Sequence, residues 1–307
     1  MSVLLPTSMP APAPAPGGLA TFFHISRFHI ILIAACASLT FSWVFSGQHL
    51  YGIPLIVAVD WFLVNLLNRV VDLAEDQTNG VVGTSFVAQH ARGLTWLCLG
   101  VMFLSFPVVQ AFYPMLMETR LLFHLIGLGY NYRFIPSFKG LTRFKELYFF
   151  KNFASGVLFI LSGIVYPVMA AGVWEQVPSG KLWLLMGFFL AMDLTYEILY
   201  DLRDLPGDRA EGVPTFPVVH GEKVARAIVV ALLGLAAALL LGGYAAHSLA
   251  FQEVIMVAAV IQQGLFVALK VPKGLKQTDC VFITYLGAAQ LLSYNVWIWL
   301  GLPLSLG

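Results

Sequence analysis

The chain has 307 residues, of which 59% are hydrophobic and only 11% are charged, whereas an ordinary soluble domain has about 25% charged residues. Too few polar side chains are present to cover a soluble protein of this size, so lipid must be the solvent for much of the surface. The formal net charge of +1 argues against nucleic acid as a partner.

Residues 1–22 are expected to form a disordered tail, because Pro6 to Gly18 alternates Pro and Ala and ends in a Gly-Gly pair. Residues 23–307 are expected to form a single all-α transmembrane domain, because about 20 mostly apolar residues make a membrane-spanning helix. About nine such segments follow one another: Phe28–Phe45, Tyr51–Asp72, Leu94–Tyr113, Leu116–Phe134, Leu147–Val168, Leu182–Tyr200, Val224–Tyr244, Phe251–Leu269 and Cys280–Leu300.

Nine crossings place alternate loops on opposite sides of the membrane. Of the 17 Lys and Arg residues, only Arg120 and Lys181 fall on the side away from the N-terminus. Cytoplasmic loops are rich in Lys and Arg, so the N-terminus and the loops near 73–93, 131–151, 201–226 and 270–279 are predicted to be cytoplasmic.

Two acidic clusters end the second and sixth segments on that side. Asn68, Asp72 and Asp76 are spaced by four residues, which puts them in one stripe along a helix. The sixth segment carries a longer acidic series: Asp193, Glu197, Asp201, Asp204 and Asp208.

Each cluster alone fits a solvated helix end that makes salt bridges. Two clusters on one side of a membrane also fit a magnesium site, because Mg²⁺ takes carboxylates together with substrate phosphates. Two such ions can hold a diphosphate leaving group. Asp193 and Glu197 lie deeper and are expected either to orient an acceptor or to be structural, and Asp60 is deeper still, where a buried acid is a functional hypothesis.

The loop from Tyr130 to Asn152 interleaves five cations with aromatic residues. One interpretation is binding of anionic lipid head groups. The other is that some of the cations contact phosphate oxygens while aromatic faces stabilise a carbocation.

These motifs resemble those of the UbiA superfamily of intramembrane prenyltransferases. The family pattern N-x-x-x-D-x-x-x-D matches Asn68, Asp72 and Asp76, and its D-x-x-x-D pattern matches Asp204 and Asp208, with a further acid at Asp201. Lys139 and the Lys151-Asn152 pair resemble the lysine pattern of the loop between the family's fourth and fifth helices.

The resemblance covers roughly residues 25–300 and implies a helical bundle around a central cavity. It also implies Mg²⁺ as cofactor, and a prenyl diphosphate and an aromatic or other small lipophilic acceptor as substrates. The implied metal ligands are Asn68, Asp72, Asp76, Asp201, Asp204 and Asp208, of which Asp72, Asp76, Asp204 and Asp208 are the catalytic candidates. The implied substrate-binding residues are Asn68, Arg69, Tyr130, Arg133, Lys139, Lys151, Asn152, Tyr200 and Asp201.

One departure from the family concerns the residues after the first motif. Many members have an Asn-Arg-Pro sequence there, whereas this chain continues Asn79-Gly80-Val-Val-Gly83. Acceptor identity and chain length are therefore left open by the sequence, as is the oligomeric state.

Two other functions share parts of the pattern. A terpene cyclase of the same family would use every metal residue without an acceptor. A cation-coupled transporter would also carry intramembrane acids, but transporters place them near the membrane midplane, whereas these acids gather at one end.

Overall fold

The computed structural model describes residues 18–78, 80–137, 140–148 and 150–303. In these ranges the chain is almost entirely helical, which confirms the all-α prediction. The helices are α1 (Gly18–Ile25), α2 (Phe28–Ser46), α3 (Gly52–Val71), α4 (Leu73–Thr78), α5 (Thr84–Phe112), α6 (Met117–Asn131), α7 (Phe150–Ile160), α8 (Tyr166–Ala170), α9 (Ser179–Glu211), α10 (Phe216–His220), α11 (Glu222–Ala245), α12 (Phe251–Val254), α13 (Val257–Lys270) and α14 (Gln277–Trp299).

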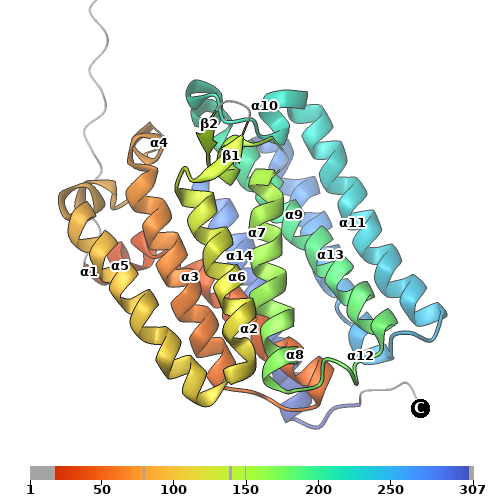
Figure 1. Cartoon of the computed structure of the whole chain (residues 1–307). Helices are drawn as coiled ribbons and strands as arrows, with labels where there is room; N and C mark the ends of the chain where they lie inside the picture. Colours follow the sequence, from red (N-terminus) through yellow and green to blue (C-terminus); the bar gives the residue numbers. More distant parts are fainter. Residues whose placement is uncertain (1–17, 79, 138–139, 149, 304–307) are drawn as a thin grey trace, which may run out of the picture.

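Short turns and one hairpin complete the described chain. The 3₁₀ turns are η1 (Pro114–Leu116), η2 (Phe144–Glu146) and η4 (Val271–Lys273), and the π-helical turn η3 (Leu161–Val165) joins α7 to α8. Strands β1 (Ile135–Ser137) and β2 (Gly140–Thr142) pair antiparallel, with Ile135 opposite Thr142. This hairpin, α4 and α10 lie at the same end of the bundle (Figure 1).

Each of the nine expected segments corresponds to a helix or to helices joined by short turns. Eight of these in the described ranges are long and apolar enough to cross a membrane. The remaining one, α6, has 15 residues and so spans only about 22 Å. The turn η1 extends this helix at its start, towards the hydrocarbon thickness of about 30 Å.

Several expected loops are helical instead. The span of α5 begins at Thr84, within the loop expected near 73–93, and α9 continues to Glu211 through the loop expected near 201–226. Polar residues can extend these helices beyond the apolar layer because water satisfies their side chains there. Gly212 ends α9 with a left-handed φ of 68°, which favours glycine.

The end of the predicted N-terminal tail overlaps the first helix. Residues 18–22 belong to α1, whereas residues 1–17 lie outside the described ranges.

Helix α5 has an apolar surface that suits contact with lipid, because Trp96, Phe103 and Phe112 are at least two-thirds exposed. Such a large apolar surface is stable in lipid and would promote aggregation in water.

A buried polar cluster ties the bundle together away from the hairpin end. The Arg120 guanidinium lies 2.6 Å from Asp60, which also accepts hydrogen bonds from His124 and from Tyr166, at 3.1 and 3.2 Å. Arg120, which lies within the fourth predicted segment, is therefore buried and paired with an acid. The network joins α3, α6 and α8, which favours a structural role for Asp60.

We expect Arg120→Met to lower the free energy of unfolding by about 3–5 kcal/mol, because it leaves the Asp60 carboxylate buried without its cation. Thermal unfolding in detergent measures the effect. The double variant Asp60→Leu, Arg120→Met should recover much of the loss. Wild-type stability in the Arg120 single variant would show that the pair does not hold these helices together.

Candidate active site

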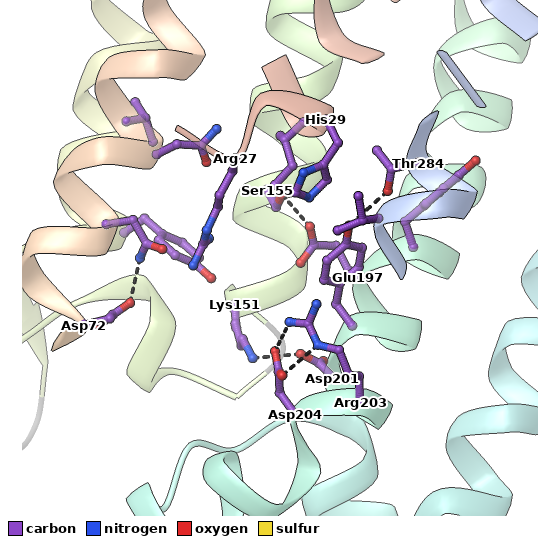
Figure 2. Close-up of a pocket in the computed structure, with 18 of the residues that line it drawn as sticks. Arg27, His29, Asp72, Lys151, Ser155, Glu197, Asp201, Arg203, Asp204 and Thr284 are labelled. Carbon is purple, nitrogen blue, oxygen red and sulfur yellow. Dashed lines mark hydrogen bonds and ion pairs between the residues drawn. The ribbon is translucent and has the colours of Figure 1, made fainter. Parts of the chain in front are cut away.

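A cavity of about 480 Å³ opens among α2, α3, α7, α9 and α14, at the hairpin end of the bundle. Its mouth is lined by charged residues from both acidic motifs, and its inner end by apolar and aromatic residues. Figure 2 shows the labelled polar side chains pointing towards one another from these helices. The fold thus brings together two motifs that lie far apart in the sequence.

The first motif lies where α3 passes into α4. Asp72 follows the last residue of α3, and the backbone bonds from Asp72 to Asn68 and from Asp76 to Asp72 keep helical spacing, at 2.9 Å each. The three side chains therefore share one side of the chain, as predicted. Asn68 Nδ2 donates to Asp72 Oδ2 at 2.6 Å and to Asn131 Oδ1 at 3.0 Å.

Cations of the chain neutralise this first motif. Asp72 accepts hydrogen bonds from Arg143 Nη1 and Lys145 Nζ, both at 2.8 Å, and Lys145 also pairs with Glu75. Burial raises the pKa of Asp72, but Lys145 and Arg143 outweigh it, so the pKa lies below its ordinary value.

Asp76 is neutralised differently. It pairs with Arg69, whose second nitrogen donates to the Val82 carbonyl oxygen at 2.8 Å. Burial raises the pKa of Asp76 above its ordinary value. Arg69 was expected to bind substrate, yet it is fully buried and does not line the cavity.

The second motif lies on the last three turns of α9. Asp201 accepts hydrogen bonds from Lys151 Nζ at 2.7 Å and from Asn152 Nδ2 at 2.8 Å, and Asp204 pairs with the neighbouring Arg203 (Figure 2). Asp208 is fully buried and does not itself line the cavity, and neither of its carboxylate oxygens has a hydrogen-bond partner among the described residues. Lys151 Nζ lies 3.5 Å from Asp208 Oδ2.

The remaining predicted residues divide into three groups. Tyr130 and Tyr200 line the cavity, and the Tyr200 hydroxyl lies 3.0 Å from Thr284 Oγ1. Arg133 is exposed, pairs with Glu146 at 2.6 Å and does not line this cavity; it lines a second pocket together with Asp72 and Glu75. Lys139 lies outside the described residues.

Sequence reasoning missed two groups of cavity residues. Lys145 lines the cavity, and Arg143 contacts Asp72 without lining it. Both stand in the same cation-rich loop as Lys139, and no spacing signal separates the three. Arg27 sits between α1 and α2 with a left-handed φ of 52°, and its guanidinium reaches into the cavity, 3.9 Å from Asp76 (Figure 2). His29 lies beside it and stacks on Tyr200, with ring centroids 6.3 Å apart.

No group of three or more His, Cys, Asp or Glu side chains in the described ranges is arranged closely enough to hold a metal ion. Lysine and arginine side chains lie between the acids instead. The mouth of the cavity is therefore a mixed network of about equal opposite charges.

Comparison with known proteins identifies the family to which the chain belongs. The sequence model of the UbiA prenyltransferase family matches residues 28–286, which is most of the chain. The protein belongs to the UbiA prenyltransferase family. The expected family membership is thereby confirmed.

Curated relatives of this UbiA family member match over shorter stretches. Digeranylgeranylglyceryl phosphate synthase of Methanobrevibacter smithii is 28% identical over 143 residues, which are 47% of this chain and 48% of the relative. The enzyme of the same name from Methanopyrus kandleri is 48% identical over 50 residues, 16% of this chain and 18% of that one. The match thus spans about half, or less, of each relative.

Solved structures of the family match over nearly the whole chain. A UbiA homologue from Archaeoglobus fulgidus bound to DMAPP and Mg²⁺ has a TM-score of 0.69 at 14% identity, covering 90% of this chain and 98% of that one. The same homologue bound to GPP and Mg²⁺ has a TM-score of 0.68 at 15% identity, with the same coverage. At these identities the likeness shows a common fold.

Proposed function

We propose that this protein is an intramembrane prenyltransferase, which moves a prenyl group from a prenyl diphosphate to a lipophilic acceptor. The observation that carries the proposal is the cavity between the two acidic motifs, charged at its mouth and apolar at its inner end. That arrangement suits a substrate with an anionic head and a hydrocarbon tail. The family membership and the ligands of the Archaeoglobus fulgidus homologue support it.

The donor set at the mouth fits Mg²⁺, which prefers oxygen ligands. Asp208 is the clearest sign, because a buried carboxylate without hydrogen-bond partners is costly unless a ligand satisfies it. Asn68, Asp72 and Asp76 would hold metal on one side of the cavity, and Asp201, Asp204 and Asp208 on the other. When bound, Mg²⁺ neutralises charge on the leaving diphosphate.

The side chains around the motifs have their own tasks in this proposal. Lys145 and Lys151 supply positive charge for the phosphate oxygens at opposite walls of the mouth. Asn152 holds Asp201 in place through its 2.8 Å hydrogen bond. The rings of Tyr130 and Tyr200 line the cavity, where aromatic faces stabilise a developing carbocation.

Replacing Lys145 and Lys151 should distinguish lysines that contact the substrate from lysines that only bind lipid head groups. We expect Lys145→Met and Lys151→Met each to lower kcat/KM by about 10- to 100-fold, because a charged hydrogen bond contributes on the order of 1–3 kcal/mol. The Met variants keep most of the apolar stem.

The matched control is a triple Met variant of Lys270, Lys273 and Lys276. These residues lie near the loop before α14, where Lys270 pairs with Asp279 at 2.7 Å, and none lines the cavity. The triple variant should keep near wild-type kcat/KM in detergent. If it loses as much activity as either single variant, the last loop belongs to the site and the division is wrong. Lys139→Met tests the position that the sequence favoured.

We further propose that the N-terminus and the loops around the mouth face the cytoplasm, from the partition of basic residues. Single cysteines at Ser137 and Gln176, at opposite ends of the bundle, test this in a background without Cys36, Cys98 and Cys280. In sealed cells an impermeant thiol reagent should label Gln176→Cys and spare Ser137→Cys. The reverse pattern would invert the proposed topology.

Product analysis tests the proposed reaction and separates it from cyclisation. Purified protein, Mg²⁺ and a panel of prenyl diphosphates are incubated with and without a membrane lipid extract, and the products are identified by mass spectrometry. A transferase gives a prenylated product only when the acceptor is supplied. Formation of cyclic hydrocarbon or alcohol without the extract would instead identify a terpene cyclase.

A further inference from the structure

Asn131, the last residue of α6, contacts the first acidic motif although it belongs to neither motif. Its side chain is 1% exposed and does not line the cavity, so it cannot touch a substrate held there. Both ends of its amide group nevertheless have partners. Nδ2 donates to the backbone oxygen of Val64 at 3.3 Å, and Oδ1 accepts from Asn68 Nδ2 at 3.0 Å.

Helix α6 reaches this position because it packs closely on α3. Gly127 lies one turn before Asn131, and a Cβ atom added there would lie only 2.7 Å from Val64 Cγ2. The absence of a side chain at Gly127 thus brings the end of α6 against α3. Asn131 can therefore reach the Val64 carbonyl, although the two residues are 67 positions apart in the sequence.

The Val64 carbonyl fixes which way two side-chain amides face. A carbonyl oxygen only accepts hydrogen bonds, so Asn131 must present its NH₂ group to Val64 and its oxygen to Asn68. Asn68 must then present its own NH₂ group to Asn131, because two amide oxygens that face each other would repel. One backbone oxygen of α3 therefore sets the orientation of both amides in turn.

The consequence of this orientation falls on Asn68 Oδ1. Both hydrogens of Asn68 Nδ2 are used, one by Asn131 and the other by Asp72 Oδ2 at 2.6 Å. No described residue donates a hydrogen bond to Asn68 Oδ1, and Asn68 lines the cavity. Mg²⁺ binds the oxygen of an amide and not its nitrogen. Asn68 can therefore be a metal ligand only while its amide keeps this orientation.

Asp72 is a weaker guide for the Asn68 amide, because its carboxylate is itself a proposed metal ligand. Its Oδ2 atom already accepts from Asn68 and from Lys145, at 2.6 and 2.8 Å, and a metal ion would compete for the same lone pairs. The hydrogen bond from Asn68 to Asn131 involves no other proposed ligand, so metal binding leaves it in place.

We propose that Asn131 is a positioning residue of the metal site, which holds the Asn68 amide so that its oxygen faces the metal. The inference rests on the proposed function, because it assumes that Mg²⁺ binds between the two motifs. It gives a task in the site to α6, a helix that carries none of the proposed metal ligands. The competing explanation is structural, namely that Asn131 only joins α6 to α3 through Val64.

The substitution Asn68→Asp separates these two explanations. A carboxylate has an oxygen on either side, so it offers oxygen to the metal in both orientations, whereas an amide does so in only one. Asn131→Leu, a change of similar size, should therefore weaken metal binding when residue 68 is Asn and not in the Asn68→Asp background. Loss of a purely structural contact would weaken metal binding in both backgrounds.

The experiment measures Mn²⁺ binding to the full-length protein in detergent, with geranyl S-thiolodiphosphate present to complete the site. Free Mn²⁺ is quantified by electron paramagnetic resonance, so the readout does not depend on turnover. A titration without protein corrects for Mn²⁺ held by the thiolodiphosphate. The variants are Asn131→Leu, Asn68→Asp and the double variant, with Asn131→Ala as a second single change. Thermal unfolding confirms that each variant is folded.

Gln263→Leu is the matched control. Gln263 is a buried amide on α13 that donates to Thr195 Oγ1 of α9 at 3.2 Å, so it also joins two helices, one of which carries a motif. It does not line the cavity. Its replacement shows how much metal affinity falls when a buried amide between helices is removed elsewhere.

We expect Asn131→Leu and Asn131→Ala each to weaken Mn²⁺ binding by about tenfold or more, because residues that orient a metal ligand typically affect affinity to that degree. In the Asn68→Asp background, Asn131→Leu should change the affinity by less than about threefold. Gln263→Leu should also stay within about threefold of wild type.

Two results would overturn the inference while the proposed function stands. Unchanged Mn²⁺ affinity in folded Asn131→Leu or Asn131→Ala would show that Asn68 needs no guide. Equal losses in the wild-type and Asn68→Asp backgrounds would make Asn131 a structural residue only. If wild-type protein binds neither Mn²⁺ nor the thiolodiphosphate, the proposed function fails and the inference fails with it.

Discussion

Asp208→Ala is expected to lower kcat at least about 100-fold, because removal of a ligand that stabilises the leaving group should cost on the order of 3 kcal/mol. The structure adds a second expectation. Since both Asp208 oxygens are buried without hydrogen-bond partners, the variant should unfold at the same temperature as wild type or at a higher one. Loss of activity with unchanged or improved stability distinguishes a functional acid from a structural one.

Two variants accompany this measurement. Asp72→Ala should lose activity to a similar degree, but it also breaks the 2.8 Å contacts to Arg143 and Lys145, so its stability should fall. Asp279→Ala is the control, because Asp279 pairs with Lys270 outside the cavity. Full turnover in folded Asp208→Ala would remove Asp208 from the site.

Removal of divalent metal is expected to abolish turnover. The two motifs place acidic side chains on both walls of a mouth that must receive a diphosphate, and the lysines present do not exceed the acids in charge. EDTA-treated protein should recover activity when Mg²⁺ is added back. Full turnover in EDTA would contradict the metal assignment.

The fold itself should survive the same treatment. Without metal, the motif acids Asp72, Asp76 and Asp201 are paired with Lys145, Arg69 and Lys151. Chelation should therefore leave the unfolding temperature nearly unchanged until substrate is added. A large drop caused by EDTA alone would mean that these ion pairs do not replace the metal.

Local patterns predicted the spans and the first motif well. The four-residue spacing of Asn68, Asp72 and Asp76 survives the junction between α3 and α4, because the helical backbone bonds continue across it. Hydropathy located the eight helices of the described ranges that are long and apolar enough to cross a membrane, but it placed the end of α9 too early. Asp201, Asp204 and Asp208 are polar residues that extend a helix beyond the apolar layer, and hydropathy detects only that layer.

The sequence could not predict which side chains pair with one another. The charge count assigned Arg120 only to the sparsely charged side, and it could not show that this helical residue is buried against Asp60. The sequence did not show that Lys145, in the turn η2, and Arg143, just before it, both reach Asp72. The sequence also could not show that Asn65 Nδ2 and Asp193 Oδ2 are buried without hydrogen-bond partners among the described residues, because the two residues lie far apart in the chain and line the same cavity.

Coupled release of diphosphate and prenylated product tests the central claim most directly. Purified protein with Mg²⁺, geranyl diphosphate and a hydroxyaromatic or lipid-extract acceptor is followed by mass spectrometry and by a diphosphate assay. We predict one diphosphate released for each prenyl group transferred, and neither product from Asp208→Ala. Wild-type protein that releases no diphosphate from any prenyl diphosphate in the presence of Mg²⁺ and acceptor would contradict the account.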